Sequence, residues 1–149
     1  MEKKFPKEVE QIKKDIVDLK IQSATNVAIS TFEGMKIFLN TKWGNDSIKD
    51  LVKSCIEVGE YLANARENEP LARNGILFLR EKSKNLFMER MDVSKAQEKL
   101  LLLINEYLDL IAKSKKIIVE KNSDNLTDFE NVLTHCHSTT AVELLMGIA

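Results

Sequence analysis

Glycine, proline and cysteine are scarce in this sequence of 149 residues, which has five, two and two of them. So few residues that bend or break a chain argue against a turn-rich fold and favour long helices. The two cysteines, Cys55 and Cys136, lack the spacing of a disulfide framework, which indicates a reducing compartment. No apolar run approaches the roughly 18 residues of a membrane span, and the charged start of the chain resembles no signal peptide. We therefore expect a cytoplasmic protein.

An excess of one charge sign is also lacking, because 22 basic residues nearly balance 23 acidic ones and leave a net charge of −1. No overall field then attracts the chain to nucleic acid or to an anionic membrane. Charged residues make up 30% of the chain and hydrophobic ones 44%, which suits a folded globule better than a disordered chain. We expect no direct nucleic-acid partner and no membrane partner.

Apolar residues recur at spacings of three and four along most of the chain, and this pattern predicts about five helices. The first helix is expected over 6–21, and the second begins after a cap at Ser23 or Thr25 and ends at 43–45. The third begins after Asp46 or Ser47, and the fourth covers 70–84. The fifth begins after a cap at Asp92 or Ser94 and reaches about 120. Their stripes predict a core that contains Val9, Ile16, Phe32, Leu51, Ile56, Leu62, Ile104 and Leu108. Cys55 lies in the third stripe, and we interpret it as a small core residue.

The pattern changes near the end of the chain. A polar, turn-like stretch at 122–128 precedes Val132–His135, a short and partly β-branched run that we predict to be a strand. Ser138 then caps a last helix, expected over 139–148. A strand followed by a helix is the first half of a βαβ unit, and its parallel partner would be a further strand after that helix. The segment therefore reads as the start of an α/β domain, or as one that pairs with another chain.

The stretch THCHSTT, residues 134–140, is the chemically densest part of the sequence. It lies where the predicted strand turns into a helix, and helix N-termini bind phosphate through free backbone N–H groups and the helix dipole. Ser138, Thr139 and Thr140 add hydroxyl donors, and a thiol at such a place ionises more easily. Cys136 is thus a candidate general base or nucleophile toward a phosphorylated substrate. The residues leave open the alternative of a capped helix with a buried, structural Cys136.

His135 and His137 flank Cys136 and also suggest a metal site. Successive residues on a strand point to opposite faces, so three consecutive side chains do not easily surround one ion. The chain holds two histidines in all, so no third imidazole is present to complete such a site. We expect no metal and no cofactor.

The sequence VLTHCHS at 132–138 resembles the ILTHCHS segment of archaeal ribose-1,5-bisphosphate isomerases and related translation initiation factor 2B-like proteins. The run EPLARN at 69–74 stands where that family has an RPT…N helix start, and 21–25 stands where it has IRGAG. The resemblance covers the whole chain, and the THCHS block is its specific part. In that family the N-terminal domain is helical and the C-terminal domain is Rossmann-like.

The resemblance implies a mostly α fold in two parts. We expect a bundle of about five helices over 1–126, followed over 127–149 by the first strand, turn and helix of a truncated α/β Rossmann-like domain. In the isomerases, the cysteine at the position of Cys136 works with an aspartate of the C-terminal domain. The regulatory relatives are translation factor subunits that assemble into larger complexes and bind sugar phosphates or nucleotides.

The chain departs from the isomerase pattern at both phosphate-binding segments. RGAG reads Gln22-Ser23-Ala24-Thr25, where a neutral Gln cannot neutralise phosphate and side chains replace the glycines. The arginine of RPT is replaced by Glu69, and Arg66 or Arg73 is a candidate to compensate, although surface ion pairing is the commoner role. The candidate ligand-binding residues are Gln22, Ser23, Arg66, Arg73, Ser138, Thr139 and Thr140.

Three functions remain open on this reading. The first, which we expect, is an initiation factor 2B-like subunit domain that is not catalytic alone. It would act in subunit assembly, as a homo-oligomer or with initiation factor 2 complex subunits, with a sugar phosphate or nucleotide as a further expected ligand. The second is part of an isomerase that converts ribose-1,5-bisphosphate to ribulose-1,5-bisphosphate, with Cys136 as the catalytic residue. The third is a helical interaction module without a ligand.

Overall fold

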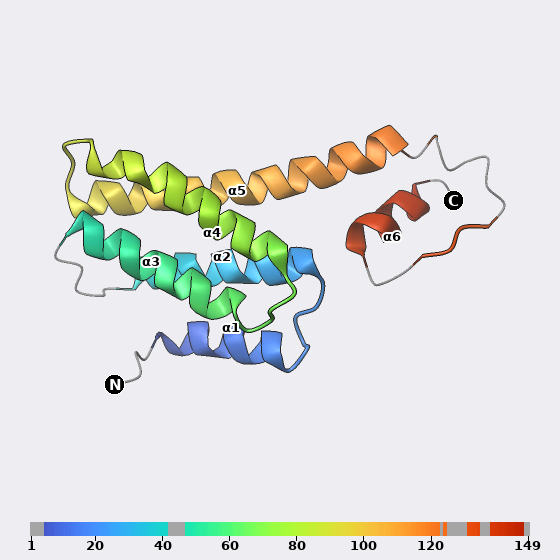
Figure 1. Ribbon diagram of the computed structural model, residues 1–149, viewed down its shortest axis with the longest axis horizontal. Helices are drawn as coiled ribbons and strands as arrows, with labels where there is room; N and C mark the ends of the chain where they lie inside the picture. Colours follow the sequence, from blue (N-terminus) through green and yellow to red (C-terminus); the bar gives the residue numbers. More distant parts are fainter. Residues whose placement is uncertain (1–4, 42–46, 123, 125–130, 135–137, 148–149) are drawn as a thin grey trace. The chain divides into compact units, whose positions relative to one another are not determined.

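The computed structural model describes residues 5–41, 47–122, 124, 131–134 and 138–147, and within them the chain is mostly helical (Figure 1). The helices are α1 (Lys7–Val17), α2 (Ala24–Asn40), α3 (Ile48–Ala63), α4 (Pro70–Ser83), the short 3₁₀-helix η1 (Lys84–Phe87), α5 (Val93–Asn122) and α6 (Thr139–Met146). They form two compact units, Met1–Leu108 and Asp109–Ala149, and the division falls inside α5. None of the described helices has a stretch that is long and apolar enough to cross a membrane.

Serine and aspartate side chains set the beginnings of four helices, as the sequence predicts. The Oγ atoms of Ser23, Ser47 and Ser138 accept hydrogen bonds from backbone N–H groups in the first turns of α2, α3 and α6, at 3.3, 3.1 and 3.3 Å. Asp92, rather than Ser94, caps α5, because its Oδ1 atom accepts from the Lys95 N–H at 2.8 Å. The predicted alternatives are thereby resolved in favour of the residue directly before each helix.

The first helix ends earlier than predicted, at Val17 instead of 21. Leu19 has a φ of 58°, a left-handed conformation that a continuing α-helix does not contain. The N–H groups of Lys20 and Ile21 both donate to the Asp15 carbonyl, at 2.9 and 3.0 Å, and so close the last turn. Apolar periodicity alone does not reveal this stop, because no glycine marks it.

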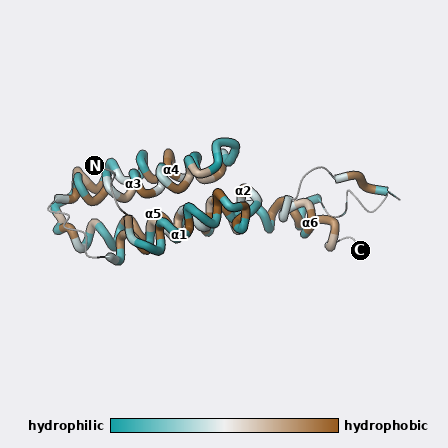
Figure 2. The backbone as a smooth tube through the Cα atoms, turned by 90° about the horizontal axis from the view of Figure 1, so that it is seen from below, coloured by the Kyte–Doolittle hydropathy of each residue, from teal (hydrophilic) through white to brown (hydrophobic). Residues whose placement is uncertain are grey.

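The central helix of the unit Met1–Leu108 is α2, which contacts α1, α3 and α4 (Figure 1). Apolar and polar stretches alternate along the helices in Figure 2, as amphipathic helices around a shared core require. All predicted core side chains are buried except Leu108, which is half-buried. In α5 the neighbouring Tyr107 takes the core-facing position, together with Ala96, Leu100 and Ile104. The predicted core was therefore correct for the bundle and wrong for Leu108.

Glycines stand where the helices of this unit cross. A Cβ atom on Gly34 of α2 would overlap Leu62 of α3, and one on Gly59 of α3 would lie 2.8 Å from the Met35 sulfur atom of α2. Gly75 of α4 is the most enclosed of the three, because a Cβ atom there would lie 2.2 Å from the nearest side-chain atom. At each crossing, the missing side chain leaves room for large side chains of neighbouring helices, which a well-packed core requires.

Gly75 lies beneath a pair of aromatic rings. Phe32 of α2 and Tyr107 of α5 have ring centroids 5.1 Å apart, and a Cβ atom on Gly75 would overlap both rings. The Tyr107 hydroxyl also donates to the Leu71 carbonyl at 2.9 Å, which ties α5 to the first turn of α4. One contact point therefore joins α2, α4 and α5.

The predicted strand at Val132–His135 is not found in the part of the chain that the structure describes. Residues 131–134 form neither helix nor strand, and Leu133 is 98% exposed. A strand forms only when its backbone groups pair with a neighbour, and no neighbouring strand is present among the described residues. His135 and residues 148–149 lie outside the described residues, and α6 ends at Met146 instead of 148. Of the strand, turn and helix predicted over 127–149, the helix is the part that the described residues show.

Replacing Gly75 by Ala should destabilise the bundle, because the added Cβ would push Phe32 and Tyr107 apart. Overpacking of this kind costs about 1–3 kcal/mol of unfolding free energy. Urea denaturation followed by circular dichroism measures the loss. The control is Asn74→Ala, on the exposed neighbouring position of the same helix, which we expect to leave stability within about 0.5 kcal/mol. Equal stability of Gly75→Ala and the control would show that this crossing is not tightly packed.

Candidate functional site

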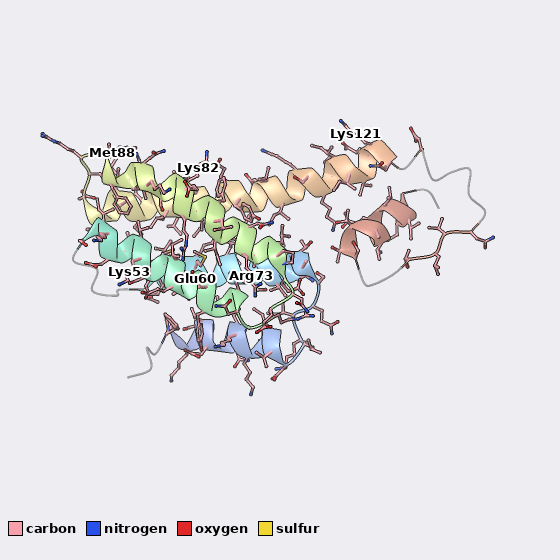
Figure 3. The ribbon with its side chains drawn as sticks, in the orientation of Figure 1. Lys53, Glu60, Arg73, Lys82, Met88 and Lys121 are labelled. Carbon is pink, nitrogen blue, oxygen red and sulfur yellow. The ribbon has the colours of Figure 1, made fainter. Side chains whose placement is uncertain are left out.

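The candidate residues of the first unit come from two loops at one end of the bundle. Helices α2 and α4 both begin at this end (Figure 1), so the loops before them, which carry Gln22, Ser23 and Arg66, lie there as well. Arg73 lies in the first turn of α4, where Figure 3 labels it. Two helix N-termini and two arginines at one end are a plausible basis for anion binding. Whether each of these side chains can bind an anion depends on the contacts that it already makes.

Gln22 and Ser23 are already engaged in local contacts. The exposed Gln22 donates from Nε2 to the Leu19 carbonyl at 2.7 Å, and Ser23 caps α2 through its Oγ atom. Ser23 also has φ 70° and ψ 147°, a conformation that favours glycine and costs a residue with a side chain about 1–3 kcal/mol. Ser23 thus has a backbone conformation typical of glycine. The side chains of Gln22 and Ser23 both stabilise the turn before α2.

The two candidate arginines have different environments. The Nη1 atom of Arg66 lies 3.2 Å from Oε1 of Glu69, whose side chain is only 9% exposed, so ion pairing is the role of Arg66 in this structure. Arg73 is half-buried, and its side chain makes no hydrogen bond or ion pair with any described residue. Arg73 is therefore the better placed of the two to meet an external anion.

The remaining candidates belong to the second unit, Asp109–Ala149. Ser138 caps α6, and Thr139 and Thr140 lie half-buried in its first turn. Cys136 lies outside the described residues, together with both histidines, so its role stays a prediction. Among the residues that are described, no cluster of three or more His, Cys, Asp or Glu side chains is arranged to hold a metal ion.

Cys55, the other cysteine, lies in the core of the first unit. Its side chain is 1% exposed, and this burial raises the pKa of the thiol to about 12, because a thiolate would lose its hydration there. A buried thiol that keeps its proton at neutral pH is a poor nucleophile. The sequence-based interpretation of Cys55 as a core residue is confirmed.

A groove between η1 and α5 was not expected from the sequence. It has a volume of about 280 Å³ and is lined by Lys82, Asn85, Leu86, Glu89, Lys99, Leu102, Leu103 and Glu106. Ion pairs cross it, with Lys82 to Glu106 at 3.8 Å and a close pair between Lys99 and Glu89. Met88, beside it, is 87% exposed and projects from the end of the bundle (Figure 3). In the sequence, this groove is indicated only by the apolar run Leu86–Met88, which lies within an otherwise polar connection.

The described chain is therefore a helical domain in which Gln22, Ser23 and Arg66 are held by internal contacts. The model of the initiation factor 2 subunit family matches residues 20–149, and the chain belongs to that family. Ribose 1,5-bisphosphate isomerase of Pyrococcus furiosus is similar to it, with 22% identity over 139 residues, 93% of this chain and 43% of that protein. The chain thus spans less than half the length of this relative. The family resemblance seen in the THCHS block is confirmed.

Replacing Ser23 by Gly should relieve the strained backbone, whereas replacing it by Ala should keep the strain and remove the cap. Because glycine is a tolerable cap, we expect Ser23→Gly to be more stable than Ser23→Ala by about 1–2 kcal/mol. Thermal and urea unfolding of the two variants measure the difference. If Ala were tolerated as well as Gly, the glycine-like conformation at this position would be refuted.

Alkaline pH should destabilise the protein partly through Cys55. In the unfolded chain this thiol ionises near its ordinary pKa of 9.0, while in the folded chain it keeps its proton to about 12. Its contribution to stability is therefore complete below about pH 9 and is lost as the pH rises toward 12. Urea unfolding between about pH 8 and 10.5 should show a decline that is steeper than in Cys55→Ala, by at most about 1.4 kcal/mol per pH unit. Parallel slopes for the two proteins would contradict this assignment.

Proposed function

We propose that this chain is a subunit domain of an initiation factor 2-type assembly, which acts through contacts with partner chains and not by catalysis of its own. Family membership supports the general class. The observation that carries the proposal is the state of α6, an apolar helix in which no residue is buried.

The second unit is rich in exposed apolar side chains. In α6, Val142 is 51% exposed and Met146 is 74% exposed. In α5, no residue after Tyr107 is buried among those described, and Leu110 and Ile117 are about half exposed. Isolated exposed apolar residues are common, but several within one small unit are typical of a surface that another protein covers.

The backbone of the segment 131–134 also suits a partner. Val132 and Leu133 are apolar, Leu133 is almost fully exposed, and the described part of the chain contains no strand with which the segment could pair (Figure 2). A partner sheet that adds this segment at its edge would satisfy the free N–H and C=O groups and cover Leu133. We therefore infer that the partner contributes a β-sheet edge as well as an apolar surface for α6.

Similarity to the Pyrococcus furiosus ribose 1,5-bisphosphate isomerase favours a second candidate function. In that case Cys136 is the catalytic residue, and Ser138, Thr139 and Thr140 bind a phosphate at the N-terminus of α6. The first unit supports this candidate less well, because Gln22 and Arg66 are engaged in internal contacts. Catalysis would then need residues that a completing chain supplies.

Replacing Val142 and Met146 together by Asp should weaken assembly, because two charges would enter the proposed interface. We expect the unaltered chain to form species larger than one chain, alone or with a second family member from the same organism, and the double variant to need at least about tenfold higher concentration. Size-exclusion chromatography with light scattering measures this over a concentration series.

The matched control is Leu77→Asp, since Leu77 is 59% exposed on α4 of the other unit. A chain that stays monomeric at every concentration and binds no family member would refute the assembly role. An isomerase assay on the same samples separates the two candidates. Turnover of ribose 1,5-bisphosphate that is lost in Cys136→Ser would favour the second function.

A further inference from the structure

Glu69 is buried where a carboxylate would ordinarily be exposed. The residue is 7% exposed, while its neighbours Glu67 and Asn68 in the same loop are exposed. Carboxylates are rarely buried without a partner, because losing hydration is costly. Arg66 is that partner, with its Nη1 atom 3.2 Å from Oε1 of Glu69 and its side chain 33% exposed.

We propose that Glu69 is an internal anion, a specificity-determining residue that keeps the guanidinium of Arg66 from binding phosphate and similar oxyanions. Its carboxylate forms an ion pair with Arg66, and a guanidinium binds carboxylate and phosphate through the same N–H groups. A phosphate that approached Arg66 would have to displace a group already attached to the loop. That internal group loses no translational freedom when it binds, whereas free phosphate does.

The charges nearby balance without an external ligand. Glu69 directly precedes α4, so its negative charge lies next to the positive end of the helix dipole. The Glu69 side chain makes no capping hydrogen bond with α4, and its ion-pair partner is Arg66. Phosphate placed beside this buried carboxylate would meet a like charge in a partly desolvated site, which weakens binding.

This inference does not depend on the proposed assembly function, which rests on the other unit. It predicts that removing one negative charge at one position opens an anion site. Glu69→Gln keeps the size of the side chain and frees the guanidinium of Arg66. Glu67→Gln removes the same charge from an exposed position two residues away and serves as the matched control. Arg66→Gln combined with Glu69→Gln removes the freed cation again.

The test is thermal unfolding of the whole chain in sodium phosphate and in sodium chloride of equal ionic strength. We expect phosphate to raise the melting temperature of Glu69→Gln by about 3 °C when it is tenfold above its dissociation constant. The unaltered chain, Glu67→Gln and the double variant should show no difference between the two salts. The proposal would be overturned if folded Glu69→Gln had the same melting temperature in phosphate and in chloride. It would also be overturned if phosphate raised the melting temperature of the unaltered chain equally.

A second measurement decides the matter if Glu69→Gln does not fold. Inorganic phosphate is titrated into the unaltered chain while the backbone amides of residues 66–73 are followed by NMR at constant ionic strength. Amide shifts that stay unchanged support closure by Glu69. Saturable shifts at millimolar phosphate would show that the site is open in the natural protein, and the proposal would then be wrong.

Discussion

The contact of Phe32 and Tyr107 above Gly75 is the constraint on which the first unit depends. It joins three helices at one point, because the ring of α2 and the ring of α5 both occupy space that a side chain on α4 would fill. The hydrogen bond from Tyr107 to the Leu71 carbonyl then sets the first turn of α4 against α5. Helices α2 and α4 both begin at the same end of the bundle, and their preceding loops share that end (Figure 1).

That end of the bundle has the general features of an anion site, yet its side chains are used internally. Gln22 and Ser23 stabilise the turn before α2, and Arg66 binds the buried Glu69. Ser23 adopts a backbone conformation that favours glycine, and its side chain caps α2. The backbone conformation of this turn and the availability of its side chains to a ligand are therefore separate properties. In this chain, Gln22, Ser23 and Arg66 are engaged in internal contacts.

The two units differ in how completely they bury their apolar residues. The first encloses Phe32, Cys55 and Ile104 among many others, and the raised pKa of Cys55 reflects the dryness of that core. In the second, α6 buries no residue, and Leu110, Ile117 and Ile118 of α5 are about half exposed. Apolar surface of this kind gains free energy when another surface covers it, which is the physical basis for a role in assembly.

The sequence by itself determined the helices, their serine caps and most of the core, because capping and apolar periodicity act over three or four residues. It also carried the family resemblance, since THCHS is a contiguous block. Tertiary structure decided which of two adjacent residues, Tyr107 or Leu108, faces the core, because that depends on where α5 crosses α4. It decided equally that Arg66 binds Glu69, since burial of the carboxylate follows from the packing around it. The strand at 132–135 could not be decided locally, because a strand exists only with a partner whose backbone completes its hydrogen bonds.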